Sequence, residues 1–149
     1  MRAVIQRVSC AEVLIDNVRT GAIKQGLLVL LAVHAKDTDQ DVRWMCDKII
    51  RLRIFDDLQG KMNLSLLDTS GEMLVVSQFT LFGDCRKGRR PSWSQAARPD
   101  LARELYQDFI DTICRKGITV QTGEFQARME VRLTNDGPVT LLLDSYKTF

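Results

Sequence analysis

Histidine is almost absent from the sequence, and cysteine is sparse and scattered. The single histidine is His34, and the four cysteines lie at positions 10, 46, 85 and 114. Structural zinc sites need clustered cysteine and histidine ligands, so we predict no metal site, and no motif indicates a cofactor. Cys46 and Cys114 fall on the apolar stripes of predicted helices, which favours core packing for both.

Familiar catalytic motifs are missing as well. The sequence contains no GxSxG elbow, no P-loop and no HExxH motif. A Ser-His or Cys-His pair would have to use His34, which we expect to be an ordinary residue at the end of a buried strand. An enzyme built on this chain would therefore act mainly through positioning and backbone polarity.

Long apolar runs and a strong net charge are absent too. No apolar run approaches the roughly 20 residues that span a bilayer, and Met1–Arg7 becomes polar too soon for a signal peptide. We therefore expect a cytoplasmic protein that does not contact membranes. The 149 residues, 45% hydrophobic and 27% charged, are sufficient for a single globular domain over 1–149.

Short apolar stretches predict several strands. Residues 12–16 are partly amphipathic, Asp16-Asn17 has turn chemistry, and 19–23 would form the returning strand. The continuous apolar run at 27–33 suits a central buried strand better than a helix, and 73–79 is predicted to be another buried strand. Near the C-terminus, residues 129–134 alternate in polarity and 139–143 are apolar, which predicts two further strands joined by a turn at Asn135-Asp136-Gly137-Pro138.

Two helices are predicted from apolar residues at helical spacing. The first follows a cap at Thr38, and the second begins near Pro99 and stops at Gly117. Their apolar faces consist of Val42, Met45, Cys46, Ile49 and Ile50 in the first helix and of Leu101, Leu105, Phe109 and Ile113 in the second. Together the elements predict an α+β fold, with a largely antiparallel curved sheet or barrel-like core and two flanking helices.

Three segments carry candidate chemistry. In Ser77-Gln78-Phe79-Thr80-Leu81 an apolar strand suddenly carries three polar side chains, which indicates either hydrogen bonding at a strand end or a site. Gly137-Pro138 has turn chemistry in any case. Arg86-Lys87-Gly88-Arg89-Arg90 places four cations within five residues, and this is either a solvated loop or a phosphate-binding segment.

In their surroundings these segments resemble the D-aminoacyl-tRNA deacylase family. The similarity also includes Gln6-Arg7-Val8, Gly26-Leu27-Leu28-Val29-Leu30 and Lys61-Met62-Asn63-Leu64-Ser65. It continues through Arg90-Pro91-Ser92 and Asn135 to Thr140, so that six motifs follow in the family's order across nearly the whole chain. Two departures, Gln126 in place of a common glycine and Cys85 in place of a common threonine, lie outside the two site motifs.

The resemblance implies a homodimer with its active site at the subunit interface. Ser77, Gln78, Phe79 and Thr80 would line the pocket for the aminoacylated 3′-adenosine of tRNA. Gly137-Pro138, with its peptide bond in the cis form, would enter that pocket from the other subunit and exclude L-amino acids. A cis bond is inexpensive before proline alone, at about 0.5–1 kcal/mol. Glycyl-tRNA would be a secondary substrate, because glycine has no side chain that the motif could exclude.

The resemblance also implies how the ester is hydrolysed. The terminal 2′-hydroxyl of the tRNA would assist, while protein groups orient the ester and stabilise the oxyanion. Our own candidate for the oxyanion donor is the backbone N–H of Phe79 or Thr80. The rival interpretation makes the Thr80 hydroxyl a covalent nucleophile, although no adjacent base is evident.

Binding of the tRNA is implied in the same way. Arg86, Lys87, Arg89 and Arg90 would hold acceptor-stem phosphates. Arg7 would either orient the carbonyls near Gly137-Pro138 or form an ordinary surface pair.

Two other classes of function compete with this hypothesis. A non-catalytic RNA-binding module would fit the basic loop, but aromatic residues make up only 7% of the chain and no RNP-like segment is present. A cysteine-dependent hydrolase is disfavoured by the lone histidine and by cysteines predicted to be packed. Loss of D-Tyr-tRNA and L-Tyr-tRNA esters, followed with and without a thiol blocker, separates the three classes.

Overall fold

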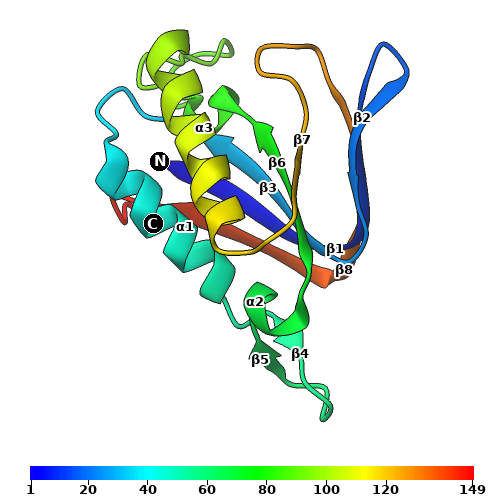
Figure 1. Cartoon of the computed structure of the whole chain (residues 1–149). Coiled ribbons are helices and arrows are strands. Elements are labelled where there is room, and N and C mark those ends of the chain that lie inside the picture. The colour runs from blue at the N-terminus through cyan, green and yellow to red at the C-terminus, as the bar shows by residue number, and fades with distance from the viewer.

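The computed structural model describes Met1–Phe149 (Figure 1). Eight strands, three α-helices and one 3-10 turn follow in this order: β1 (Arg2–Ile15), β2 (Val18–Ile23), β3 (Gly26–Ala32), α1 (Asp39–Arg51), β4 (Phe55–Asp56), β5 (Met62–Leu64), α2 (Leu66–Thr69), β6 (Glu72–Ser77), η1 (Phe79–Phe82), α3 (Pro99–Arg115), β7 (Val120–Thr122) and β8 (Glu130–Asp144). None of the helices has the length and apolar content needed to cross a membrane.

Six strands form one curved sheet around β1. The order is β2-β1-β3-β6-β7, and β8 pairs with the other edge of β1. The sheet curls until β2 approaches β7, where a Cβ added to Gly21 would lie 2.6 Å from the carbonyl oxygen of Thr122. Only glycine allows the two backbones to come this close. The predicted α+β class with a barrel-like core is therefore confirmed.

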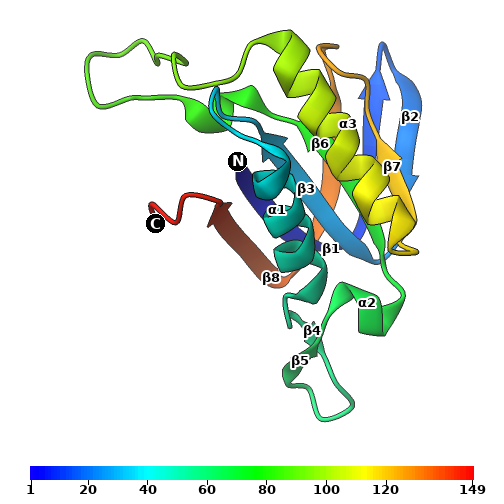
Figure 2. The ribbon, with the colours of Figure 1, turned by 60° about the vertical axis from the view of Figure 1, so that its left-hand side comes forward.

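Each face of the curved sheet has its own apolar core. The larger core lies between the sheet and the two long helices, α1 and α3, which run side by side across one face (Figures 1 and 2). The smaller core fills the concave side of the sheet and includes Val8, Val13, Leu28, Leu74 and Val76. The strands of the centre are buried on both faces, which explains the continuous apolar runs in β3 and β6.

The two long helices begin where the sequence predicts. The side chains of Thr38 and Asp41 form a capping box at the start of α1, and Pro99 occupies the first turn of α3. Gly117, just beyond α3, has a φ of +83°, which glycine adopts without strain. The hydroxyl of Tyr106 donates to the carbonyl of Val75 at 2.9 Å and so ties α3 to β6.

Several predictions about the strands need correction. The predicted turn at Asn135–Pro138 is a bulge within a single long strand, β8, because both halves pair antiparallel with β1 and the chain does not reverse. Strand β6 ends at Ser77, and Phe79 already belongs to η1. The β3–β6 and β6–β7 pairings are parallel, whereas all three partners of β1 are antiparallel to it.

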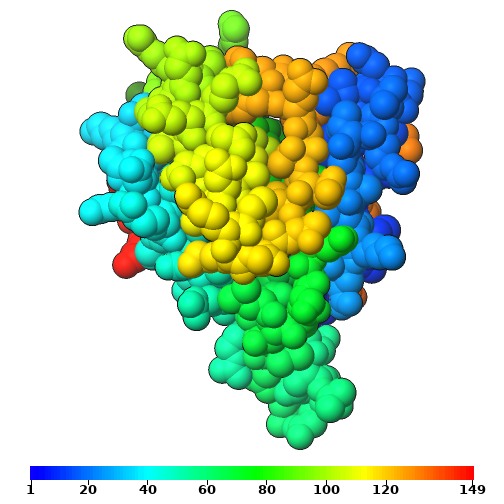
Figure 3. Space-filling model, viewed as in Figure 1, coloured from blue at the N-terminus to red at the C-terminus, as the bar shows by residue number.

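Smaller features also differ from expectation. Cys46 is buried as predicted, but Cys114 is exposed, because it lies one residue beyond Ile113 and therefore about 100° around the helix from the buried face. The short helix α2 and the hairpin β4–β5 were not predicted. Each depends on capping or turn residues over only a few positions, without a periodic apolar pattern. That hairpin projects from the body of the molecule (Figure 3).

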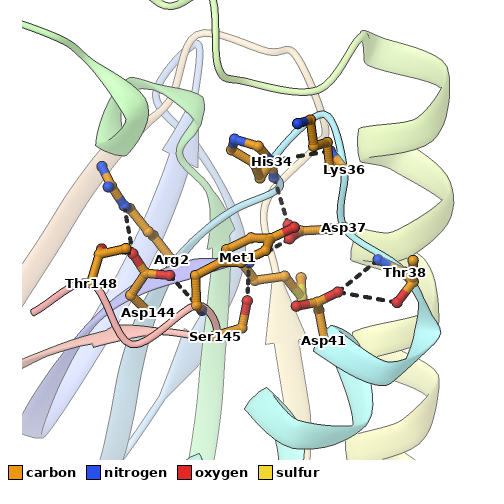
Figure 4. A network of polar contacts seen from close by, with 11 residues as sticks. Met1, Arg2, His34, Lys36, Asp37, Thr38, Asp41, Asp144, Ser145 and Thr148 are labelled. Carbon is orange, nitrogen blue, oxygen red and sulfur yellow. Dashed lines mark hydrogen bonds and ion pairs between the residues drawn. The ribbon is translucent and has the colours of Figure 1, made fainter.

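A buried ion pair fixes the first residue of the chain. The ammonium group of Met1 donates to Asp37 Oδ1 at 2.7 Å and to Ser145 Oγ at 2.5 Å (Figure 4). The other carboxylate oxygen of Asp37 accepts the backbone N–H of His34 at 2.6 Å. Because neither charge is exposed to solvent, each depends on the other for compensation.

This pair generates a prediction about stability. Substitution of Asp37→Asn leaves a buried ammonium without a counter-charge and should lower the free energy of unfolding by about 3–5 kcal/mol. The matched control is Asp47→Asn, which removes an exposed pair with Lys116 at 3.0 Å and should cost at most about 1 kcal/mol. Urea unfolding of both variants measures the difference, and equal small losses would contradict the assigned role of Asp37.

Candidate active site

The C-terminal ends of β3 and β6 open into a cavity of about 550 Å³. Ten of its fourteen lining residues are hydrophobic, one is Pro99, and the polar side chains are those of Ser77, Gln78 and Gln126. The full lining consists of Ala32, Val33, Val76, Ser77, Gln78, Phe79, Ala97, Pro99, Ala102, Phe125, Gln126, Ala127, Met129 and Val131. An apolar wall with a few polar groups at one end is typical of small-molecule sites.

The polar end of the cavity is made where β6 turns into η1. The N–H of Gln78 still donates to the carbonyl of Leu31 at 2.8 Å, and the chain then leaves the sheet. The N–H groups of Phe79 and Thr80 come first in η1, so no partner for them lies within the turn. Two adjacent backbone donors at the mouth of a cavity have the chemistry that a developing oxyanion requires.

Of the predicted site residues Ser77, Gln78, Phe79 and Thr80, only Thr80 does not line the cavity. Its side chain is exposed, and its hydroxyl accepts a hydrogen bond from Gln78 Nε2 at 2.5 Å. A primary amide cannot remove a proton from the hydroxyl, and His34 is engaged elsewhere. The structure thus provides no base beside Thr80.

Gly137 and Pro138 lie in the bulge of β8, and the peptide bond between them is cis. Arg7 is 6% exposed and donates from Nε to the carbonyl oxygen of Asp136 at 3.3 Å. Asn135 Nδ2 donates to the carbonyl oxygens of Arg7 and Val139 at 3.1 and 3.0 Å. Side-chain hydrogen bonds therefore hold the backbone before and after Gly137.

Arg7 is buried, and its guanidinium has several further partners. Its guanidinium also donates to the carbonyl of Ile54 at 2.7 Å and forms ion pairs with Asp56 and Asp136 at 3.4 and 3.2 Å. A surface pair would leave the guanidinium in water, and this one is enclosed. An added Cβ at Gly137 would lie 2.8 Å from Arg7 Nη2, so the two residues are in direct contact.

The two predicted site motifs do not meet within one chain. Ser77 aligns with Leu31, Ala3 and Leu143 across the sheet, whereas Gly137 lies opposite Arg7, four residues further along β1. Strand geometry then separates the motifs by about 13 Å along the strands and about 14 Å across three strand spacings. Within one chain the Gly-Pro bulge and Ser77 therefore lie on different strands and at different heights of the sheet.

The four predicted basic residues lie on the loop between η1 and α3, which projects from the body (Figure 2). Arg86 makes two hydrogen bonds to the Asp84 carboxylate, at 2.9 and 2.7 Å, and these hold the pKa of Asp84 well below its usual range. Lys87, Arg89 and Arg90 are exposed and form no ion pair. Three uncompensated cations therefore remain on the loop.

His34 and the cysteines take no part in the cavity. His34 Nδ1 accepts the N–H of Lys36 at 3.1 Å, and its ring packs 5.3 Å from those of Phe82 and Tyr146. Burial raises the pKa of the Cys46 thiol to about 12, which keeps it protonated and unreactive. None of the four cysteines lines the cavity, so the cavity itself offers no thiol nucleophile.

Sequence reasoning missed part of the cavity wall. Residues 125–131 face β6 across the opening, although the alternation around Met129 had indicated only a strand. A second concavity, of about 690 Å³, lies against β2 and contains none of the predicted site residues.

Comparisons with known proteins identify the family. The family model described as D-Tyr-tRNA(Tyr) deacylase matches residues 4–144. Proteins named D-aminoacyl-tRNA deacylase from Clostridioides difficile (strain 630) and Thermosipho africanus (strain TCF52B) are 61% and 59% identical over 149 residues, covering all of both chains.

Solved structures share the fold. One described as "c-Myc DNA Unwinding Element Binding Protein" has a TM-score of 0.91 and 38% identity, over 97% of this chain and 98% of its own. Another, "Structural Analysis of a probable eukaryotic D-amino acid tRNA deacylase", has a TM-score of 0.84 at 20% identity, over 95% of this chain and 97% of its own, which shows the fold alone. Because the family model and the relatives span essentially the whole sequence, the chain belongs to the D-aminoacyl-tRNA deacylase family of hydrolases.

Proposed function

We propose that this enzyme hydrolyses the ester between a D-amino acid and the 3′-terminal adenosine of tRNA, releasing free D-amino acid and tRNA. One observation carries the proposal within the structure. The segment Ser77 to Thr80, in which polar side chains and the first backbone donors of η1 come together, lies at one end of a mostly apolar cavity. The names of the family and of the relatives supply the substrate class. Such proofreading takes place in the cytoplasm, where charged tRNA is used.

The catalytic step relies on positioned dipoles and on the substrate itself. The backbone N–H groups of Phe79 and Thr80 stabilise the negative charge that develops on the carbonyl oxygen of the ester as water attacks. The neighbouring 2′-hydroxyl of the terminal ribose assists the reaction. The absence of a base beside Thr80 supports this division of roles, because a side-chain nucleophile would need one.

A second subunit completes the site in this proposal. Gly137 and Pro138 lie on a different strand from Ser77 of their own chain and at a different height of the sheet, and the bulge acts instead on the cavity of a partner in a homodimer. Two features support the assignment. The backbone of the bulge is held on both sides by Arg7 and Asn135, and β8 is an edge strand that exposes 60% of Leu142.

In this proposal the enzyme distinguishes D- from L-amino acids by excluding the L-residue sterically. Rigid main chain at Gly137-Pro138 faces the α-carbon of the bound amino acid, and its carbonyls accept hydrogen bonds from the ammonium group of a D-residue. The Cβ of an L-residue would collide with the same main chain. Glycine has no Cβ and is accepted as a secondary substrate.

The first prediction concerns the bulge. Substitution of Gly137→Ala places a Cβ 2.8 Å from Arg7 Nη2 and 2.9 Å from Val139 Cγ2, at a φ of +116° that alanine rarely adopts, so either these side chains or the bulge itself must shift. A misplacement of about 1 Å costs about 100-fold in rate, so kcat/KM on D-Tyr-tRNA should fall by about that factor.

Gly60→Ala is the matched control, because Gly60 also has a positive φ, of +73°, but no atom within 4 Å of an added Cβ. Deacylation of D-Tyr-tRNA, L-Tyr-tRNA and Gly-tRNA is followed for each variant. Equal cleavage of the two tyrosyl esters by the unmodified enzyme, or equal losses in both variants, would refute the exclusion mechanism.

The second prediction separates RNA-assisted hydrolysis from a covalent route through Thr80. Substitution of Thr80→Ala should keep kcat within about tenfold, whereas a 2′-deoxy terminal adenosine should lower it by about 100-fold or more, the usual contribution of a group that transfers protons. Single-turnover deacylation measures both. Complete loss with Thr80→Ala and full activity with the 2′-deoxy substrate would establish the covalent route instead.

The third prediction concerns the basic loop, which we propose binds acceptor-stem phosphates. Neutralising Arg89 and Arg90 to glutamine should raise KM for tRNA more than it lowers kcat. The slope of log affinity against log salt should also become shallower, by about 1 for each phosphate that the loop no longer binds.

The effect of Arg86→Gln should be smaller, because Asp84 already compensates that charge. Arg115→Gln, on an exposed helix end, is the control. Unchanged tRNA affinity in the Arg89 and Arg90 variant would show that the loop is only solvated.

A further inference from the structure

Two aromatic side chains are exposed together at the mouth of the cavity. Phe79, which lines the cavity, is 56% exposed, and Trp93 is 38% exposed. Their ring centroids are 5.8 Å apart at an interplanar angle of 66°, so the rings pack edge to face against each other rather than into the core. Large aromatic side chains left in solvent beside a cavity indicate a binding surface.

Trp93 is held in place by the base of the basic loop. Asp84 and Ser92 exchange backbone hydrogen bonds of 2.7 and 3.0 Å, which close the loop immediately before Trp93. The carbonyl of Trp93 accepts the N–H of Ala96 at 3.0 Å. A Cβ added to Gly83 would lie 3.3 Å from the indole nitrogen, so the ring rests directly on backbone. The indole is therefore already ordered, and a ligand that binds its exposed surface would cost little side-chain conformational entropy.

The electrostatic surroundings select the kind of ligand. The loop closed by Asp84 and Ser92 carries Lys87, Arg89 and Arg90, and the one nearby carboxylate, Asp84, is already paired with Arg86. Aromatic faces beside uncompensated cations are the arrangement on which single-stranded nucleotides bind, with bases stacked on the rings and phosphates near the cations.

We propose that Trp93, supported by Phe79, stacks the base of the nucleotide that precedes the terminal adenosine of the tRNA. This inference rests on the proposed function, in which the cavity holds the aminoacylated adenosine. Trp93 does not line the cavity but packs on Phe79 at its rim, which is where the chain of the RNA must leave. The platform guides the single-stranded 3′ end between the basic loop and the cavity.

Kinetics on two substrates test the platform. Substitution of Trp93→Ala should raise KM for D-Tyr-tRNA by about tenfold, the usual effect of removing one base-stacking ring. The D-tyrosyl ester of free adenosine lacks the stacked nucleotide, and its KM should change by less than about twofold in the same comparison. Trp93→Phe keeps an aromatic face and should restore most of the affinity for tRNA.

Trp44→Phe, on α1, is the matched control, and it leaves Trp93 as the only tryptophan of the chain. In that background an oligonucleotide ending in CCA should quench tryptophan fluorescence, and the same oligonucleotide with an abasic penultimate position should not. Equal KM changes on both substrates, or no change on either, would overturn the proposal, as would quenching that ignores the abasic site. If the unmodified enzyme leaves D-Tyr-tRNA intact, the proposed function fails, while the quenching experiment still reports on the platform.

Discussion

The pairing of β1 along both of its edges is the constraint on which the rest of the structure depends. One edge pairs with β3 and then with β2, and the other pairs with β8 over nearly the whole strand. A slip of one residue in any of these pairings would exchange the buried and exposed faces, so the two apolar cores fix the register. That register places Ser77 and Gly137 on different strands, four residues apart in their level along β1.

Rigidity near the site comes from backbone held by side chains rather than from a catalytic triad. Arg7 and Asn135 hold the bulge of β8, and the Asp84–Ser92 pairing holds the loop that carries the cations and Trp93. In both places these hydrogen bonds restrict the conformations of the backbone before substrate binds. Binding therefore costs less conformational entropy. A hydrolase without a histidine base needs such positioning, because orientation and fixed dipoles then supply most of the acceleration.

The sequence predicted correctly the helix starts and the tight turn that depend on residues close to one another in the chain. The capping residue Thr38, the proline at the start of α3 and the turn at Asp16 and Asn17, both with positive φ, all act within a few residues of themselves. The errors arose where partners distant in sequence decide the outcome. Asn135–Pro138 has turn composition, yet β1 pairs with both flanks and keeps them in one strand. Cys114 was assigned to the core, but it lies beside the buried face of α3.

The sequence by itself determined the two long helices, most of the strands, the polar motif at Ser77–Thr80 and the resemblance to a family, because propensity, periodicity and motif order are written in neighbouring residues. Only the tertiary structure decided that residues 125–131 complete the cavity, that Arg7 is buried against the bulge and that Trp93 packs on Phe79. These contacts join segments that are not neighbours in the sequence. Their formation depends on how the sheet curls and on where a loop closes, and neither is encoded in any single stretch of the chain.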